Sequence, residues 1–318
     1  MYNTSYVKIQ VYYVFGATDE TYKLVESYTT LDFLESKKSF EEFYKVATLT
    51  EDEKHKILID SQAKLQEYAK KLISGEKTHI SIGDPTAGSN TFLIYGYDLI
   101  MAECEELKPG AISKSVFSFY GQELKAFQYC LGLINMIFHN TIDSYNTGIE
   151  IVDQNSNVIS NYFNGIGKMK GQLDIVVANP PYGTKDYGIT YATDNKINDD
   201  RWKYGVPKKQ EGEYAFLMTI YDLLNKQGKS VIVMPLGTLF RDGAKELRKH
   251  LLTEDVVEGL VTLPGNMFLT TSIPVVLWIL NKKSETLHNE NGFLKMPFLG
   301  LGIFASAYII YHGIAHEP

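Results

Sequence analysis

A tetrapeptide that carries an amide, two prolines and an aromatic ring stands near the middle of the chain. It is Asn179–Tyr182 (NPPY), and it follows the apolar run Asp174–Ala178 (DIVVA). Two consecutive prolines fix φ and remove two N–H donors, so this segment cannot continue a sheet and must form a stiff arch. We expect the arch at the carboxyl end of a central strand, where open α/β sheets bind ligands.

The groups of this arch suit one reaction. The exocyclic amine of a planar base can donate its two hydrogens to the Asn179 side-chain oxygen and the Pro180 carbonyl, while the Tyr182 ring stacks on the base. Two acceptors leave the nitrogen lone pair available for attack on a methyl sulfonium. The alternative is a proline-rich turn with a packed tyrosine, which would use none of these polar groups. The pattern therefore favours methyl transfer to a flat amine.

A second motif, Asp84–Asn90 (DPTAGSN), joins an apolar strand-like run to an apolar segment at Thr91–Leu99. Small residues at such a turn let the backbone approach a ligand closely, and the N–H groups of the next helix favour anionic or polar groups. On this motif alone, an ordinary strand-to-helix turn stays equally open.

A single acid, Glu123, ends the following YGQE motif at Tyr120–Glu123. An acid at the end of the second strand can accept hydrogen bonds from both hydroxyls of a ribose. Its distance along the chain from Asp84 exceeds the ~20 residues of nicotinamide sites. We therefore expect residues 101–115 to lengthen the connection, and together the two motifs favour a nucleoside-containing cofactor.

The elements around these motifs alternate between strand and helix patterns, which indicates a doubly wound, Rossmann-like α/β fold with a mostly parallel central sheet and helices on both faces. Helical periodicity precedes them, and Gly75 follows its last apolar position. We predict a helical N-terminal segment at 1–77, a catalytic domain at 78–283 and a tail at 284–318. The expected strands are His79–Gly83, Val116–Tyr120, Ile149–Val152, Asp174–Ala178, Ser230–Met234, Val256–Leu263 and Pro274–Leu280, and the expected helices are Leu124–Phe138 and Tyr214–Asn225, the latter ended by Gly228.

Composition restricts the class of protein further. The two isolated cysteines, Cys104 and Cys130, form neither a disulfide framework nor a zinc site, and the start of the chain lacks a signal-peptide pattern, so we expect a cytoplasmic protein. Met296–Ala315 contains no charged residue, but its glycines and proline argue against a membrane span. The net charge of −7 predicts that a separate subunit does much of any DNA gripping.

The motifs and their order resemble a known family. Asp84–Ile94 resembles motif I of N6-adenine DNA methyltransferases, Tyr120–Glu123 resembles their motif II, and NPPY is their motif IV, in the order of the gamma class. Tyr120–Asn140 and Gly212–Lys283 are similar to the modification subunits of type I restriction systems.

That resemblance implies a cofactor, a site and partners. The cofactor would be S-adenosylmethionine, with no metal, and the target an adenine flipped out of double-stranded DNA. The implied partners are a specificity subunit and, for cleavage, a restriction subunit. Asn179, Pro180, Pro181 and Tyr182 would be catalytic, and the cofactor would contact Asp84, Thr86, Gly88, Ser89, Glu123, Asp153 and Asn179.

The chain also departs from the family. Asn90 stands where the family usually has Gly, so its side chain is expected to crowd the cofactor, and the chain looks shortened at both ends. Two other functions therefore stay open: a non-catalytic subunit that serves in assembly, and a methyltransferase acting on protein glutamine. The polar loop Thr184–Gln210 is expected either to face DNA or to be simply solvated, and the same holds for Arg241 and Arg248; the basic residues of the loop are Lys185, Lys196, Arg201, Lys203, Lys208 and Lys209.

Overall fold

A computed structural model of the chain describes residues 10–12, 65–141, 150–151, 162, 165–184, 187–253, 256–263 and 273–282. Its strands are β1 (Gln10–Tyr12), β2 (Ile80–Asp84), β3 (Phe117–Glu123), β4 (Glu150–Ile151), β5 (Leu173–Ala178), β6 (Leu224–Pro235), β7 (Val257–Leu263) and β8 (Val275–Asn281). A helix covers residues 65–74, followed by α5 (Thr91–Leu107), α6 (Ala126–Phe138), α7 (Ile189–Asp194), α8 (Gly212–Leu223) and α9 (Lys245–Thr253). Short 3₁₀ turns are η1 (Lys114–Val116), η4 (Ile166–Met169), η5 (Asp200–Trp202), η6 (Leu236–Leu239) and η7 (Asp242–Ala244).

The strands of the described residues form one sheet in the order β1-β7-β8-β6-β5-β2-β3-β4. Strands β6, β5, β2, β3 and β4 are parallel, whereas β8 pairs antiparallel with both β6 and β7. From β2 the chain proceeds outward to β3 and β4, and it then returns to build β5 and β6 on the other side. This reversal of direction between β2 and β5 confirms the doubly wound α/β fold.

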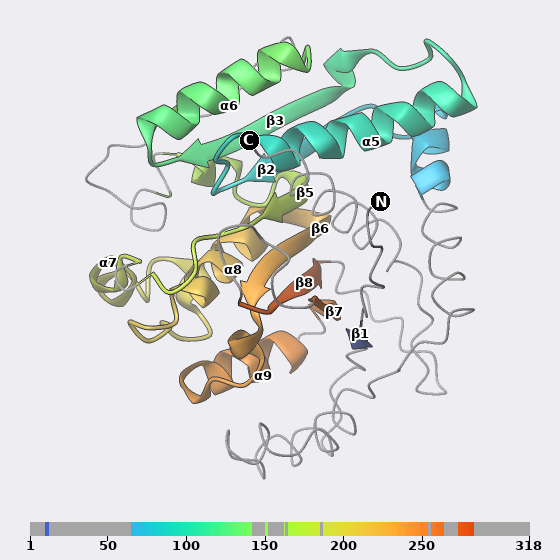
Figure 1. Ribbon diagram of the computed structural model, residues 1–318. Coiled ribbons are helices and arrows are strands. Elements are labelled where there is room, and N and C mark those ends of the chain that lie inside the picture. The colour runs from blue at the N-terminus through green and yellow to red at the C-terminus, as the bar shows by residue number, and fades with distance from the viewer. Residues whose placement is uncertain are drawn as a thin grey trace, which may run out of the picture.

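Helices cover both faces of the sheet (Figure 1). On one face, α5 and the helix at 65–74 pack on β2 and β3 through buried side chains such as Leu72, Ile82 and Leu93. Tyr97 of α5 meets Phe117 of β3 edge to face, with ring centroids 4.9 Å apart. The helix at 65–74 therefore contributes to the same hydrophobic core as β2. Gly75 ends that helix with φ +77°, as its position in the sequence predicted.

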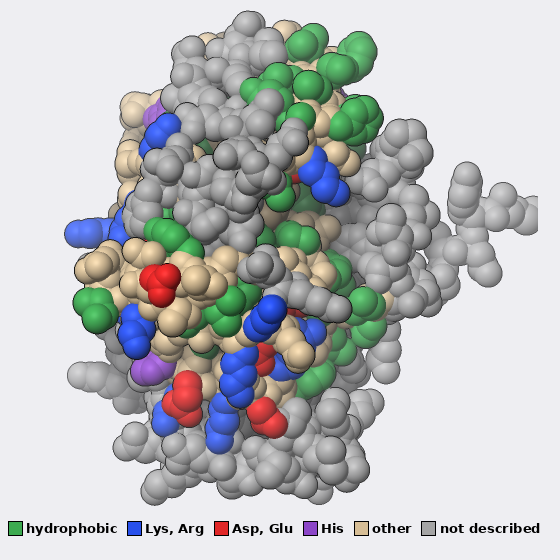
Figure 2. Space-filling model, turned by 90° about the vertical axis from the view of Figure 1, so that its left-hand side faces the viewer, with side chains coloured by type: hydrophobic (Ala, Val, Ile, Leu, Met, Phe, Trp, Pro, Cys, Tyr) green, Lys and Arg blue, Asp and Glu red, His purple; other side chains and the backbone are tan. Residues whose placement is uncertain are grey.

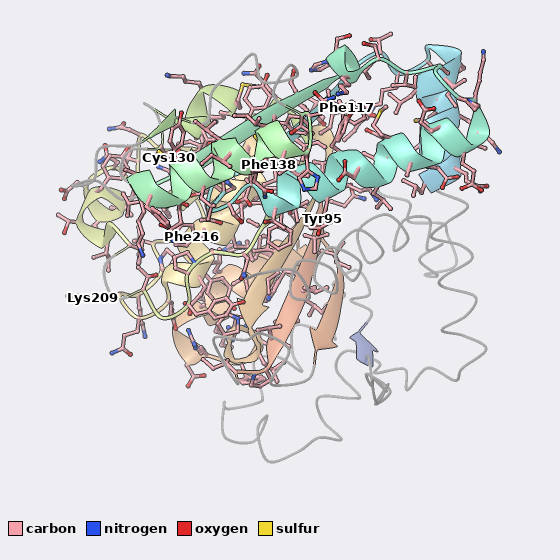
Figure 3. The ribbon with its side chains drawn as sticks, turned by 45° about the horizontal axis from the view of Figure 1, so that its top comes forward. Tyr95, Phe117, Cys130, Phe138, Lys209 and Phe216 are labelled. Carbon is pink, nitrogen blue, oxygen red and sulfur yellow. The ribbon has the colours of Figure 1, made fainter. Side chains whose placement is uncertain are left out.

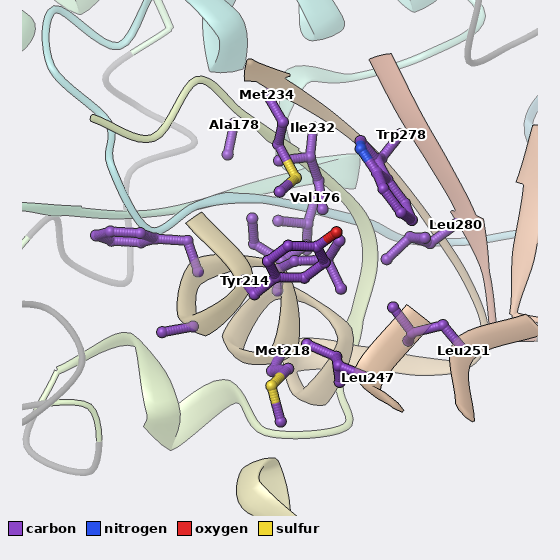
Figure 4. Packing of buried hydrophobic residues seen from close by; sticks show 14 of the residues in the cluster. Val176, Ala178, Tyr214, Met218, Ile232, Met234, Leu247, Leu251, Trp278 and Leu280 are labelled. Carbon is purple, nitrogen blue, oxygen red and sulfur yellow. The ribbon is translucent and has the colours of Figure 1, made fainter. Parts of the chain in front are cut away.

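The opposite face is built around α8, whose side chains are buried on nearly all sides. Tyr214 and Met218 of this helix lie among side chains of β5, β6, β8 and α9 (Figure 4). The Tyr214 ring stands edge-on to Trp278 of β8 at a centroid distance of 6.1 Å. A helix that is apolar all round must be buried on several sides, and β5 below it is correspondingly apolar. This rigid layer supports the carboxyl end of β5.

Several boundaries differ from the sequence-based expectation, and β3, for example, ends at Glu123 rather than Tyr120. Helix α8 ends at Leu223 rather than Asn225, and β6 begins at Leu224, so Gly228 lies inside a strand instead of ending a helix. The physical reason is tertiary: the early part of β6 pairs with β5 at Leu173 and continues with β8 at Lys229. The loop after NPPY is also more ordered than its polar sequence suggested, since it contains α7 and η5.

No helix among the described residues has the length and apolar character needed to span a bilayer. The predicted tail at 284–318 lies outside the described residues. The domain boundaries at 77 and 283 stay predictions.

Candidate active site

The three predicted motifs, DPTAGSN, YGQE and NPPY, lie at one edge of the sheet. Strands β2, β3 and β5 are parallel, so their carboxyl ends at Asp84, Glu123 and Ala178 lie on the same side. The arrow of β3 in Figure 1 points to this side, where α7 also lies. Strands β2 and β5 are direct neighbours, with Gly83 opposite Val176. Asp84 and the NPPY arch thus flank the point where the winding reverses, which is where open sheets bind ligands.

The turn after β2 is held by its own side chains and by β3. Asp84 Oδ1 accepts hydrogen bonds from the Thr86 backbone N–H at 2.8 Å and from the Thr86 hydroxyl at 3.1 Å. The Ala87 N–H donates to the Gln122 carbonyl at 3.0 Å. Asn135 of α6 donates through Nδ2 to the Ser89 carbonyl at 3.0 Å. The turn is therefore fixed from three sides.

Glu123 connects the two predicted cofactor motifs. Its Oε2 accepts the Gly88 N–H at 2.9 Å, and its Oε1 accepts the Lys125 N–H at 2.8 Å. An ionised carboxylate has about four lone-pair positions, so both oxygens keep capacity for hydroxyl donors. This arrangement fits a ribose held by Glu123 beside the Gly88 backbone.

The Asp84 carboxyl is fully buried, and burial, which disfavours the charged form, raises its pKa to about 7. The hydrogen bonds from Thr86 oppose this rise, and the nearby Glu123 charge adds to it. Asp84 Oδ2 is buried and receives no hydrogen bond from the described residues. A buried acceptor without a donor fits a cationic ligand, and S-adenosylmethionine carries both a sulfonium and an ammonium group.

Asn90 packs against α6, and its expected crowding of the cofactor stays a prediction. It adopts left-handed backbone with φ 61°, and its side chain faces α6, where a Cβ on Gly132 would stand 2.7 Å from Asn90 Nδ2. The side chain is 1% exposed, and neither its Nδ2 nor its Oδ1 has a hydrogen-bond partner among the described residues. The helix accommodates this amide because its facing residue is glycine.

The NPPY arch begins directly after β5, with Pro180 buried and Pro181 exposed. Tyr182 Oη donates a 2.7 Å hydrogen bond to Asn179 Oδ1. Burial raises the pKa of Tyr182, so its phenol stays protonated and acts as the donor. An amide oxygen has two lone pairs, and the second one stays available to another donor.

Two residues that sequence reasoning did not assign to the site hold the end of the arch. The Gly183 N–H donates to Glu213 Oε1 at 3.0 Å, and Arg241 Nη1 pairs with Glu213 Oε2 at 3.2 Å. Glu213 lies in the first turn of α8 and is fully buried. An acid in the first turn of a helix whose other side chains are mostly apolar was the signal that could have identified it.

Two of the basic residues that were expected to face either DNA or solvent make contacts within the fold. Arg201 is 3% exposed; it pairs with Asp199 at 2.6 Å and stacks on the Tyr162 ring at 3.9 Å. Arg248 Nη1 donates to Tyr214 Oη at 3.0 Å and to the Arg241 carbonyl at 2.8 Å. The expectation was wrong for Arg201, which is buried, whereas Arg248 is half-buried and binds neighbours within the fold.

The exposed lysines of the same loop are Lys196, Lys203, Lys208 and Lys209. Lysine and arginine side chains gather on the lower half of the face seen in Figure 2, which looks at the side of the molecule where α7 lies. Lys209 projects on that side in Figure 3. Lys185 and Asp153 lie outside the described residues. The strand expected before Asp153 is confirmed in part, as β4 pairs with β3 at Gln122 and Glu123.

Comparison with known proteins identifies the family. The family model of the N-6 DNA methylases matches residues 62–295. The chain belongs to this family. Among its relatives, the methylase subunit of the type I restriction enzyme MpnII from Mycoplasma pneumoniae is 27% identical over 290 residues, which is 84% of this chain and 50% of the relative. That of MjaVIII from Methanocaldococcus jannaschii is 31% identical over 223 residues, or 67% of this chain and 36% of the relative.

A solved structure agrees with the fold. The type I restriction-modification methyltransferase subunit from Streptococcus thermophilus matches with a TM-score of 0.51 and 27% identity, covering 70% of this chain and 43% of that one. The chain thus spans half or less of the length of these relatives. All three motifs of the candidate site lie inside the range that the family model matches.

Proposed function

We propose that this chain is the catalytic part of a site-specific DNA adenine N6-methyltransferase, acting as the modification subunit of a type I restriction system. One observation carries the proposal: the NPPY arch follows β5 immediately beside β2, whose carboxyl end bears Asp84 and the turn bound to Glu123. An acceptor for an amine and a cradle for a cofactor thus share one edge of the sheet. Family membership supports the same activity.

S-adenosylmethionine would supply an electrophilic methyl group when bound. Glu123 would accept the ribose hydroxyls, since its oxygens are already aligned by Gly88 and Lys125. Asp84, with an unpartnered buried oxygen, would face the cationic part of the molecule. Thr86, Gly88 and Ser89 would line its methionine end, and Asn179 would border it from the side of the arch. Asp153 is proposed for the adenine end on family resemblance alone.

The arch would bind the target base. Asn179 Oδ1 and the Pro180 carbonyl would accept the two amino hydrogens of a flipped adenine, and the Tyr182 ring would stack on it. The hydrogen bond from Tyr182 Oη fixes the orientation of the Asn179 amide before the base enters. These acceptors keep the nitrogen lone pair free for the methyl carbon. As the nitrogen–carbon bond forms, the methyl carbon–sulfur bond would break with its electron pair going to sulfur, and the extra proton on the nitrogen would pass to water.

The proposed substrate is double-stranded DNA in the cytoplasm. A specificity subunit would recognise the DNA sequence, and a restriction subunit would bind the complex when DNA is cleaved. The net charge of −7 supports a separate subunit as the main DNA-binding part, because non-specific affinity for DNA depends on lysine and arginine contacts to phosphate. The exposed lysines of the loop after NPPY, including Lys208 and Lys209, would give local contacts on the side of the active edge.

The chemical identity of the acceptor tests the proposal. The chain, with its specificity subunit, is incubated with S-adenosylmethionine labelled in the methyl group, DNA and bulk protein, and the DNA is digested to nucleosides. We expect label in N6-methyladenine. Label on protein glutamine would favour the other known use of such an arch. Cofactor binding without any transfer would mean a non-catalytic subunit.

A further inference from the structure

The arch is deficient in backbone donors, and its anchoring depends on the residues that come after it. Pro180 and Pro181 have no N–H, so these two positions cannot be tied down by a sheet ladder. Gly183 comes next after Tyr182, with φ +64°, and its N–H points to the carboxylate of Glu213. The Thr184 hydroxyl adds a longer hydrogen bond of 3.3 Å to the Pro181 carbonyl.

Glu213 is placed to hold this turn rigidly. It is fully buried in the first turn of α8, the helix that packs in the hydrophobic core together with β5, β6 and β8. A buried carboxylate is costly unless it is paired and hydrogen-bonded, and here one oxygen receives the Gly183 N–H while the other faces Arg241. The Arg241 side chain is 36% exposed, so it brings the compensating charge from the surface side.

The start of α8 also fits closely against the segment behind the arch. A Cβ on Gly212 would lie 3.1 Å from the Thr184 carbonyl oxygen and 3.1 Å from Tyr187 Cβ. Glycine at this position lets the helix approach near enough for the next residue, Glu213, to reach Gly183. The close contact and the hydrogen bond are two independent observations that α8 supports the arch.

We propose that Glu213, charge-balanced by Arg241, is a positioning residue that fixes the NPPY arch by accepting the Gly183 N–H. This role rests on the proposed function, because the expected effect of losing Glu213 is a slower methyl transfer. Asn179 and Pro180 must meet the amine of the base at hydrogen-bonding distance, and a displacement of about 1 Å from the reactive geometry can cost roughly a hundredfold in rate. Glu213 touches neither base nor cofactor in this scheme.

Hydrogen exchange tests the contact without any need for activity. Gly183 is exposed, so without the carboxylate its amide would exchange nearly as fast as in an unfolded chain. We expect the wild-type amide to be protected, and Glu213→Ala to speed its exchange about tenfold to a hundredfold, the strength of a charge-assisted hydrogen bond. Glu213→Gln keeps an acceptor oxygen and should retain most of the protection. An unprotected Gly183 in the wild-type chain would overturn the proposal even if Glu213→Ala fails to fold.

Kinetics of the full chain with its specificity subunit test the consequence. Glu213→Ala should lower kcat for methyl transfer at least about tenfold and leave the Kd for S-adenosylmethionine within about twofold, with partial recovery in Glu213→Gln. Glu211→Gln is the matched control, a buried acid at the Ncap position of α8, and it should keep the wild-type kcat. Equal losses of kcat and cofactor affinity, or an unchanged kcat despite faster exchange, would refute the positioning role. A wild-type chain without activity but with a protected Gly183 would instead refute the proposed function.

Discussion

The backbone N–H of Gly88 donates a 2.9 Å hydrogen bond to Glu123 Oε2. This contact joins the turn after β2 to the end of β3, so the two halves of the cofactor cradle form one unit. Because the same carboxylate also receives the Lys125 N–H, its removal would release two backbone donors at once.

Glu123→Ala should therefore weaken S-adenosylmethionine binding strongly. A hydrogen bond to a charged group contributes about 1.5–3 kcal/mol, so we expect the Kd to rise at least about tenfold, measured by titration calorimetry. Glu106→Ala, which removes an exposed acid of α5, is the control and should bind as the wild type does. Equal affinity of Glu123→Ala and the control would remove Glu123 from the cofactor site.

Asp84 predicts a pH dependence of stability. Its pKa rises from 3.8 to about 7 on folding, so the folded protein holds this proton more tightly than the unfolded chain. The contribution to the free energy of unfolding is fully present below about pH 4 and is lost as pH rises toward about 7. Compared with Asp84→Asn, which cannot ionise, the wild type should lose relative stability between about pH 4 and pH 7 in urea titrations. Parallel curves for the two proteins would contradict this.

Asn90 and Gly132 form a pair whose substitution should be coupled. Asn90→Gly removes a buried amide without partners and relieves left-handed backbone, and we expect a gain of about 1 kcal/mol in the free energy of unfolding. Gly132→Ala would place its Cβ 2.7 Å from Asn90 Nδ2 and 2.9 Å from the Gly88 carbonyl oxygen, so it should cost about 1–3 kcal/mol. The double variant should recover part of that loss, and strict additivity in urea titrations would show that the two residues do not interact.

Substitution of Arg201 should affect the free energy of unfolding, whereas substitution of Lys208 and Lys209 should affect DNA binding. Arg201→Ala leaves Asp199 buried without its charge partner, at a cost of about 3–5 kcal/mol in the free energy of unfolding. Replacing both lysines by Ala should leave the melting temperature unchanged. It should weaken DNA binding by the whole complex and reduce the salt dependence of log K by about two. A normal salt dependence in the double lysine variant would mean that the loop does not contact phosphate.

Much of the fold followed from periodicity, because strands buried on both faces have few alternatives. Ile80–Asp84 and Leu173–Ala178 are such runs, and both lie within about a residue of their predicted limits. The end of α8 and the start of β6 were not predicted, since residues 224–229 take strand conformation only through pairing with β5 and β8. Tertiary contacts, rather than local propensity, determine the secondary structure of these residues.

The positions of the candidate site residues in the fold were predictable where the residue type restricts the backbone or follows a strand. The arch at Asn179–Tyr182 follows from its prolines, and Glu123 from its place at a strand end. Glu213 was missed because a single glutamate in a helix is ordinarily a surface residue, and only the packing of α8 buries it. For the same reason Arg201 was misread, because a basic residue in a polar loop gives no sign that it turns inward.

The most direct test of the account is Asn179→Ala. Methyl transfer to N6 of adenine and binding of S-adenosylmethionine are measured on the same preparation, together with the specificity subunit. Since Asn179 would accept a hydrogen from the target amine, we predict that transfer falls at least about a hundredfold while cofactor affinity stays within a few-fold. Retained transfer, or cofactor binding that is lost along with it, would contradict the assignment of the arch to the substrate base.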